Sequence, residues 1–145
     1  NILVASAEGK AVNLEATPGG VFELEPENGV VTHANHMVAG AEYCTNHGSK
    51  FRDGVLRRRL MAHHGELDLE ILRSCLTDHE MKPGWPTRYP ESDCLEAVCS
   101  HVPYGDIDVD KIWKTIASSI YDLSGRTAYI CKGCPCQGQF TAYPL

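Results

Sequence analysis

The sequence predicts one α+β domain spanning residues 1–145, with an antiparallel sheet and two helices. Three observations predict this class: short alternating segments at residues 2–36, helical periodicity at residues 50–79, and a hairpin pattern at residues 114–132. Strands this close in sequence favour antiparallel pairing, because a parallel pair needs a long crossover. Helices that follow a run of strands indicate a layer of helices over one sheet face.

The N-terminal part is expected to form three short strands. They are residues 2–6, 11–16 and 21–25, separated by turn signals at residues 7–10 and 17–20. In the middle strand Val12 and Leu14 alternate with Asn13 and Glu15, so this strand has one apolar and one polar face.

Residues 29–37 hold the most informative polar side chains. A β-branched run at residues 30–32 predicts a buried strand, and the chain then switches to His33, Asn35 and His36. On an extended chain His33 and Asn35 share one face and His36 lies on the other. Two interpretations are open. These residues bond to loop backbone at the exit of a strand, or Asn35 offers its amide N–H to a developing oxyanion.

Helical periodicity predicts helices at residues 50–64 and 69–79. The first carries an apolar stripe that includes Phe51 and Val55. Asp68 is the expected N-cap of the second, whose apolar face includes Leu72 and Cys75. Residues 82–110 are rich in proline and lack periodicity, so they predict a long surface excursion. A strand at residues 114–122 and its hairpin partner at 127–132 follow.

Composition narrows the class of partner. The net charge of −6 argues against nucleic acid, and the basic run at residues 57–59 fits a solvated helix face. No apolar run approaches the length of a membrane span, which argues against a membrane partner. Seven cysteines cannot all pair within one chain, so we expect reduced cysteines and a cytoplasmic location. The chain runs from Asn1 straight into an apolar strand, which suggests that residues precede it.

A cluster of thiols near the C-terminus offers a possible zinc site. Its Cys-x-x-Cys-x-Cys spacing comprises Cys131, Cys134 and Cys136. A fourth ligand would be Cys94, Cys99 or His101. The alternative is a strand end and turn with incidental thiols. A redox role for Cys131 and Cys134 is less favoured, because no helix follows that would lower a thiol pKa.

Four segments resemble the isopenicillin-N acyltransferase family of N-terminal-nucleophile hydrolases, which is related to acyl-coenzyme A:aminopenicillanate acyltransferase. Residues 9–18 are similar to its sheet hairpin, and His33-Ala34-Asn35-His36-Met37 resembles its His-Thr-Asn-His-Phe signature. Residues 113–122 are similar to its penultimate strand, and residues 133–136 with Phe140 to its closing strand and tail. The segments occur in the family's order and leave residues 82–110 poorly matched.

The resemblance implies a four-layer αββα sandwich, in which an autoproteolytic cut exposes a cysteine nucleophile that uses its own α-amine as base. This chain would be the C-terminal half, with the nucleophile upstream and Asn35 in the oxyanion hole. His33, His36 and Lys114 are assigned to the substrate side. The expected substrate is a small-molecule amide or thioester. No metal and no cofactor is implied, although an acyl-coenzyme A is a possible acyl donor.

Alone, the chain is expected to be inactive, and to pair with the N-terminal part of its parent protein or with itself. One departure from the family matters. Its substrate-side arginine is replaced by Ile112, with Lys111 and Lys114 the nearest cations. Lysine cannot reproduce a bidentate arginine clamp, so penicillin-type chemistry does not follow. The competing hypothesis is a non-catalytic, zinc-stabilised binding module built on Cys131, Cys134 and Cys136.

Overall fold

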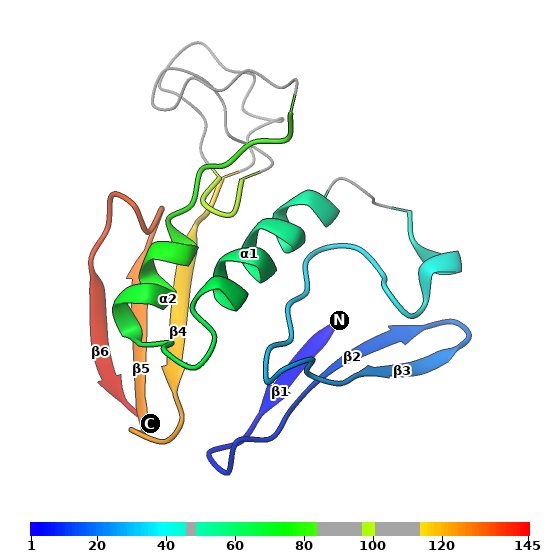
Figure 1. Cartoon of the computed structure of the whole chain (residues 1–145), viewed down its shortest axis with the longest axis horizontal. Helices are drawn as coiled ribbons and strands as arrows, with labels where there is room; N and C mark the ends of the chain where they lie inside the picture. Colours follow the sequence, from blue (N-terminus) through cyan, green and yellow to red (C-terminus); the bar gives the residue numbers. More distant parts are fainter. Residues whose placement is uncertain (46–48, 84–96, 101–113) are drawn as a thin grey trace. The chain divides into compact units, whose positions relative to one another are not determined.

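The computed structural model describes residues 1–45, 49–83, 97–100 and 114–145, and Figure 1 traces the chain through them. The chain divides into two compact units, Asn1–Ala62 and His63–Leu145, each described here by itself. The predicted α+β class is confirmed, because the described residues contain two α-helices and two three-stranded antiparallel sheets. Neither of these helices has the length and apolarity needed to cross a membrane.

The sheet of the first unit matches the three predicted strands to within one residue at each end. It consists of β1 (Ile2–Ala5), β2 (Ala11–Thr17) and β3 (Gly20–Leu24), in the order β1-β2-β3. Both pairs are antiparallel, with Val4 opposite Val12 and Glu15 opposite Phe22. The turn before β2 places Gly9 at a φ of +85°, which glycine adopts without steric cost.

Strand β2 buries its polar face. Asn13 and Glu15 are fully buried, whereas Val12 and Leu14 on the opposite face are only half-buried. On the neighbouring edge strand β1, Ile2 and its two apolar neighbours are exposed. The alternation in the sequence correctly predicts two unlike faces, but the structure shows that the charged one lies inside. A carboxylate can be buried only where hydrogen-bond donors meet it.

The predicted strand at residues 30–32 is wrong. The chain there makes one isolated bridge, between Glu27 and Val30, and residues 31–36 follow without ladder pairing. Residues 35 and 36 lie in a bend, so the alternation of a regular strand does not apply to these polar side chains. The single turn of 3₁₀-helix η1 (Ala41–Tyr43) comes next. The physical reason is the buried Glu15, whose carboxylate binds the backbone of residues 38–40 and thereby bends the chain back over β2.

Helix α1 (Lys50–Ala62) ends two residues before its predicted end. Of the predicted apolar stripe, Val55 is the fully buried member. The basic run is more than a solvated face, because Arg57 donates to the carbonyl of Val30 at 3.5 Å and pairs with the carboxylate of Glu27. These contacts fasten α1 to the loop that carries the predicted site.

The second unit begins with helix α2 (Leu69–Leu76), which ends three residues earlier than predicted. Its sheet has the order β4-β5-β6, with β4 (Ala117–Asp122), β5 (Thr127–Lys132) and β6 (Phe140–Pro144) in antiparallel pairs. Helix α2 packs against β4, and its Arg73 guanidinium lies 5.3 Å from the centre of the Phe140 ring. This agrees with the predicted layering of a helix on a sheet.

Strand β4 begins at residue 117, not at the predicted residue 114. Two of the preceding residues bond to partners that lie outside β5. Thr115 donates its N–H to Ser100, and the carbonyl of Ile116 accepts from Gly133. The predicted surface excursion falls mostly outside the described residues, together with Cys94, His101, Lys111 and Ile112. Its described part at residues 97–100 is largely buried, contrary to the predicted surface position, and Ala97 there shares one apolar cluster with Met81.

The N-cap of α2 gives the first testable prediction. The carboxylate of Asp68 accepts the backbone N–H of Ile71 at 2.8 Å, as predicted for a capping residue. We expect Asp68→Ala to lower the free energy of unfolding by about 1 kcal/mol, measured by urea denaturation. The control is Glu66→Ala, which removes an exposed carboxylate two residues earlier. Equal losses in the two variants would contradict the capping role.

Candidate functional site

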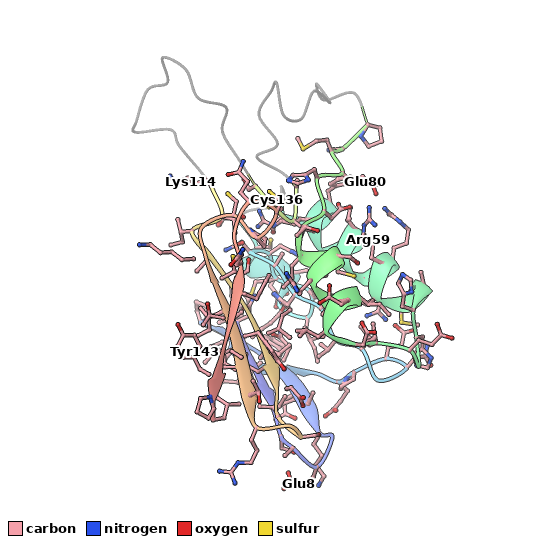
Figure 2. The ribbon with its side chains drawn as sticks, turned by 90° about the vertical axis from the view of Figure 1, so that its left-hand side faces the viewer. Glu8, Arg59, Glu80, Lys114, Cys136 and Tyr143 are labelled. Carbon is pink, nitrogen blue, oxygen red and sulfur yellow. The ribbon has the colours of Figure 1, made fainter. Side chains whose placement is uncertain are left out.

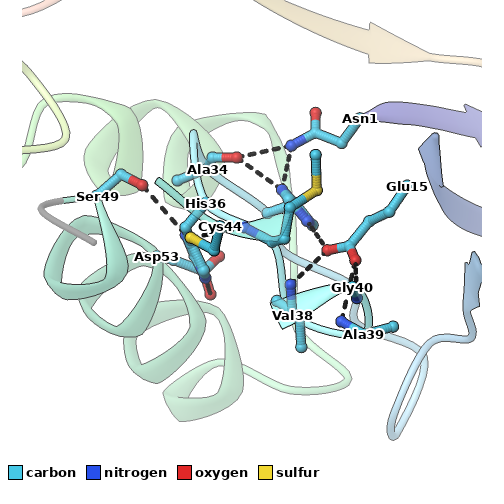
Figure 3. A network of polar contacts seen from close by, with 12 residues as sticks. Asn1, Glu15, Ala34, His36, Val38, Ala39, Gly40, Cys44, Ser49 and Asp53 are labelled. Atoms are coloured by element: carbon cyan, nitrogen blue, oxygen red, sulfur yellow. Dashed lines mark hydrogen bonds and ion pairs between the residues drawn. The ribbon is translucent and has the colours of Figure 1, made fainter. Parts of the chain in front are cut away.

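The first unit is centred on the buried carboxylate of Glu15, drawn in Figure 3. Its Oε1 accepts the N–H of Val38 at 2.6 Å, and its Oε2 accepts the N–H groups of Ala39 and Gly40, each at 2.9 Å. The Nε2 of His33 lies 2.6 Å from Oε1 and donates to it, because an ionised carboxylate only accepts. Four donors therefore converge on one carboxylate.

This arrangement decides the charge of Glu15. Burial by itself would raise the pKa of Glu15, but the N–H of Gly40, the ring of His33 and the N–H of Val38 outweigh it. They lower the pKa from 4.5 to about 2, because they hydrogen-bond to the charged form. Consecutive N–H groups directed at one anion act as a backbone anion-binding nest. Glu15 is thus a buried, ionised group at neutral pH.

His33 extends this network to a second histidine. Its Nδ1 lies 2.7 Å from the carbonyl oxygen of Ala34, and its ring stacks on that of His36 at 5.4 Å between centroids and an interplanar angle of 17°. The ring of His36 is buried, with Nδ1 at 3.1 Å from the hydroxyl of Ser49 and Nε2 at 4.0 Å from the carboxylate of Asp53. Burial lowers the pKa of His36, although Asp53 opposes the shift, so this ring is neutral at pH 7.

Asn35 has the opposite environment, because its side chain is exposed. Its Oδ1 accepts a hydrogen bond from Nη2 of Arg52 at 2.7 Å. A guanidinium can only donate, so the atom facing Arg52 must be the amide oxygen. The amide nitrogen of Asn35 consequently points away from Arg52, with two N–H groups available to an acceptor. Helix α1 therefore fixes the orientation of this amide.

The structure brings together only part of the predicted site. Asn35, His33 and His36 all lie in the first unit, with both histidine rings buried and Asn35 at the surface. Lys114 is an exposed residue of the second unit, where its charge acts on Cys134. Whether these residues contact a substrate stays a prediction.

Sequence reasoning missed Glu15 and Arg52. Glu15 was visible only as part of a polar strand face, and nothing in the sequence indicated that this face is the buried one. Arg52 lies five residues before the basic run at residues 57–59, and only that run stands out in the sequence. Asn13 was also missed. Its amide is fully buried beside Glu15, and neither its oxygen nor its nitrogen has a hydrogen-bond partner among the described residues.

The second unit holds a separate group of metal-binding side chains. Atoms of His79, Cys99 and Cys136 that can bind a metal lie within 4.8 Å of one another, the largest such group among the described residues. Figure 2 shows Cys136 at the end of this unit that also carries Glu80 and Lys114. His79 follows α2, Cys99 lies in the segment 97–100, and Cys136 precedes β6.

These donors differ from the set that the sequence suggests. Cys136 and Cys99 are in the group, but the thiol of Cys131 is buried in β5 and is not. Cys134 lies next to the group, with its thiol 3.4 Å from the carbonyl of Thr115 and 3.6 Å from that of Ser100. Cys94 and His101 lie outside the described residues. The group in the structure thus shares Cys99 and Cys136 with the predicted set, and His79 is the member that spacing did not reveal.

The environment of these thiols argues against redox chemistry. Burial, together with the neighbouring Cys136, raises the pKa of Cys99, and burial likewise raises the pKa of Cys134. A reactive thiol needs the opposite shift, because the thiolate is the nucleophile.

The chain was compared with known proteins. No family model, no curated protein and no solved structure matches it. The resemblance to the acyltransferase family therefore rests on the four sequence segments, and its consequences are proposals.

Glu15 gives a prediction about acid stability. Its folded-state pKa is depressed, so its contribution is fully present above the unfolded value of about 4.5 and is lost as the pH falls toward 2. We expect Glu15→Gln to lower the free energy of unfolding at pH 7 by on the order of 2 kcal/mol. The gap to the wild-type chain should close between pH 4.5 and 2. Urea denaturation at several pH values measures both.

The matched control is Glu23→Gln, which neutralises an exposed carboxylate on the adjacent strand β3. It should leave the acid transition unchanged. If Glu15→Gln retains the full pH dependence of the wild-type chain, the buried carboxylate is not the source of that dependence.

Proposed function

We propose that this chain is the C-terminal part of a cysteine N-terminal-nucleophile amidohydrolase or acyltransferase, with Asn35 as an oxyanion-hole donor. In that chemistry a cysteine thiolate attacks the carbonyl of an amide or thioester, and the carbonyl oxygen becomes an oxyanion. Collapse of the adduct expels the amine or thiol and leaves an acyl-enzyme, which water or an amine then cleaves. The nucleophile would belong to the part of the parent protein upstream of Asn1.

The observation that carries the proposal is the hydrogen bond between Arg52 and Asn35. A donor stabilises an oxyanion best when its orientation is fixed before the reaction begins. Arg52 holds the amide oxygen at 2.7 Å, so the exposed amide nitrogen needs no reorganisation to donate. The position of Asn35 in the His-Ala-Asn-His-Met segment supports the same role.

The hydrogen bonds of Glu15 support this role, because they hold the loop that carries Asn35. The loop that carries Asn35 is bound to β2 by Glu15 through His33 on one side and Val38 on the other. His36, three residues after His33, bonds to Ser49 immediately before α1. Because both histidine rings are engaged and buried, we assign them to positioning Asn35, with substrate contact as the alternative for each.

Three further observations support a layered enzyme of which this chain is one part. Two helices and two antiparallel sheets are the kinds of layer that an αββα sandwich contains. Strand β1 exposes Ile2, Leu3 and Val4 at 61%, 54% and 48%, and exposed apolar residues on an edge strand favour association. The buried amide of Asn13 also lacks a partner among the described residues, as expected where a further segment or a substrate completes the site.

The proposed substrate is a small molecule with an amide or thioester bond, and an acyl-coenzyme A remains a possible acyl donor. Lys114 is the proposed cation on the substrate side. We place the protein in the cytoplasm, where its thiols would stay reduced.

The proposal predicts the effect of changing Asn35 in the parent protein that contains the nucleophile. Asn35→Ala removes the donor without touching the nucleophile, so kcat for hydrolysis of an amide substrate should fall by about 10²- to 10³-fold. Thermal unfolding should stay close to that of the wild type, because the side chain is exposed. Near-normal turnover would remove Asn35 from the mechanism.

Arg52 provides a second variant. Arg52→Ala should lower kcat by less than Asn35→Ala does, since it releases the amide without removing it. Lys50→Ala is the matched control, because Lys50 is an exposed cation two residues earlier in the same helix. If the two variants have equal activity, Arg52 does not orient the donor.

A further inference from the structure

We propose that His79, Cys99 and Cys136 bind a structural zinc ion, with Cys134 as the fourth ligand. The site lies within the second unit and does not depend on the function proposed for the first. Three stretches of chain that are distant in sequence contribute to it, namely the exit of α2, the segment 97–100 and the turn before β6. Thiols that were close together only because they share one strand end would not be expected to have His79, from the exit of α2, beside them.

The donor chemistry selects the metal. Thiolate sulfur and imidazole nitrogen suit zinc, whereas magnesium and calcium prefer oxygen ligands. Three cysteines and one histidine are an established ligand set of four-coordinate structural zinc. Sulfur atoms bound to one tetrahedral zinc at about 2.3 Å lie roughly 3.8 Å apart. The present atoms are all within 4.8 Å, so small side-chain movements bring them to the bonding distance.

Backbone hydrogen bonds join two of the three stretches and fix the shape of the third. The N–H of Cys99 donates to the carbonyl of Asp78 at 2.8 Å, which places Cys99 next to His79. The N–H groups of residues 137 and 138 both donate to the carbonyl of Cys134, at 3.1 and 3.0 Å, so the Cys-Pro-Cys segment is a compact turn. A site whose ligands are fixed before binding loses less conformational entropy when the ion binds.

Cys134 is the best placed fourth ligand among the described residues. Its thiol hydrogen-bonds to that of Cys99, and it lies two residues before Cys136 in the same turn. It does not yet belong to the three-membered group, because it is directed at the carbonyls of Ser100 and Thr115. A rotation about its Cα–Cβ bond redirects the sulfur. Cys131 is less suitable, since its thiol is not in the group and packs closely against Gly138.

The role of the ion follows from where its ligands come from. It would tie the exit of α2 to the turn between β5 and β6, at the end of the unit opposite the hairpin that joins β4 and β5. With four protein ligands there is no open position for water, so the site stabilises the fold and performs no chemistry of its own. Removing the ion should therefore lower stability, because binding free energy in such sites is folding free energy.

The first test is zinc content, measured by elemental mass spectrometry on the 145-residue chain purified under reducing conditions from cells supplied with zinc. We expect one zinc per chain. Cys99→Ser and Cys136→Ser should each lose most of it. Cys44→Ser, which removes a partly buried thiol of the first unit, is the control and should keep one zinc per chain. A chain without zinc, a chain with iron or copper in its place, or full zinc in Cys136→Ser would overturn the proposal.

A second measurement does not depend on whether the variants fold. A chelator added to the wild-type chain should lower the urea midpoint of unfolding, and zinc, but not magnesium, should restore it. An unchanged midpoint after complete removal of zinc would overturn the structural role. Cobalt replacement then tests the fourth ligand. Thiolate-to-cobalt absorption should fall by about one third in Cys134→Ser, from three thiolates to two. Unchanged absorption would exclude Cys134.

Discussion

The buried carboxylate of Glu15 is the constraint on which the first unit depends. A carboxylate taken out of water must be matched by donors, and here the donors are three successive backbone N–H groups and one imidazole. The loop from His33 to Gly40 can supply them only by curving over β2. Glu15 therefore determines the path of this loop, and the loop carries the residues that we assign to function.

Helix α1 is attached to this part of the unit mainly by polar contacts and not by a large apolar core. Val55 is its one fully buried apolar side chain, whereas Arg52 and Asp53 contact the loop and Arg57 contacts Glu27 and Val30 just before it. Polar contacts of this kind are directional, which suits a unit that must hold one exposed amide in a fixed orientation. The second unit is held together differently. Its helix α2 packs on its sheet, and thiols and a histidine lie close together at one end.

Local patterns were enough to predict most of the elements. Strands β1 to β5, the two helices and the cap at Asp68 follow from alternation, periodicity and capping chemistry, which act within a few residues, whereas no local pattern predicted β6. The strand expected at residues 30–32 does not form. The following loop bends because its backbone bonds to Glu15, and these bonds join residues more than twenty positions apart, which no local pattern can predict. His79 was missed for the same reason. Its neighbours Cys99 and Cys136 are distant in sequence, and spacing alone led to Cys131 instead.

The direct test of this account is an NMR titration of the backbone amide protons of Val38, Ala39 and Gly40 in the isotope-labelled chain, starting at pH 7. If Glu15 organises the loop as an ionised group with a pKa of about 2, the three resonances hold their positions through pH 4.5 and move together only below it. Movement with a midpoint near 4.5 while the chain is still folded, or three unrelated titrations, would contradict the central place given to Glu15.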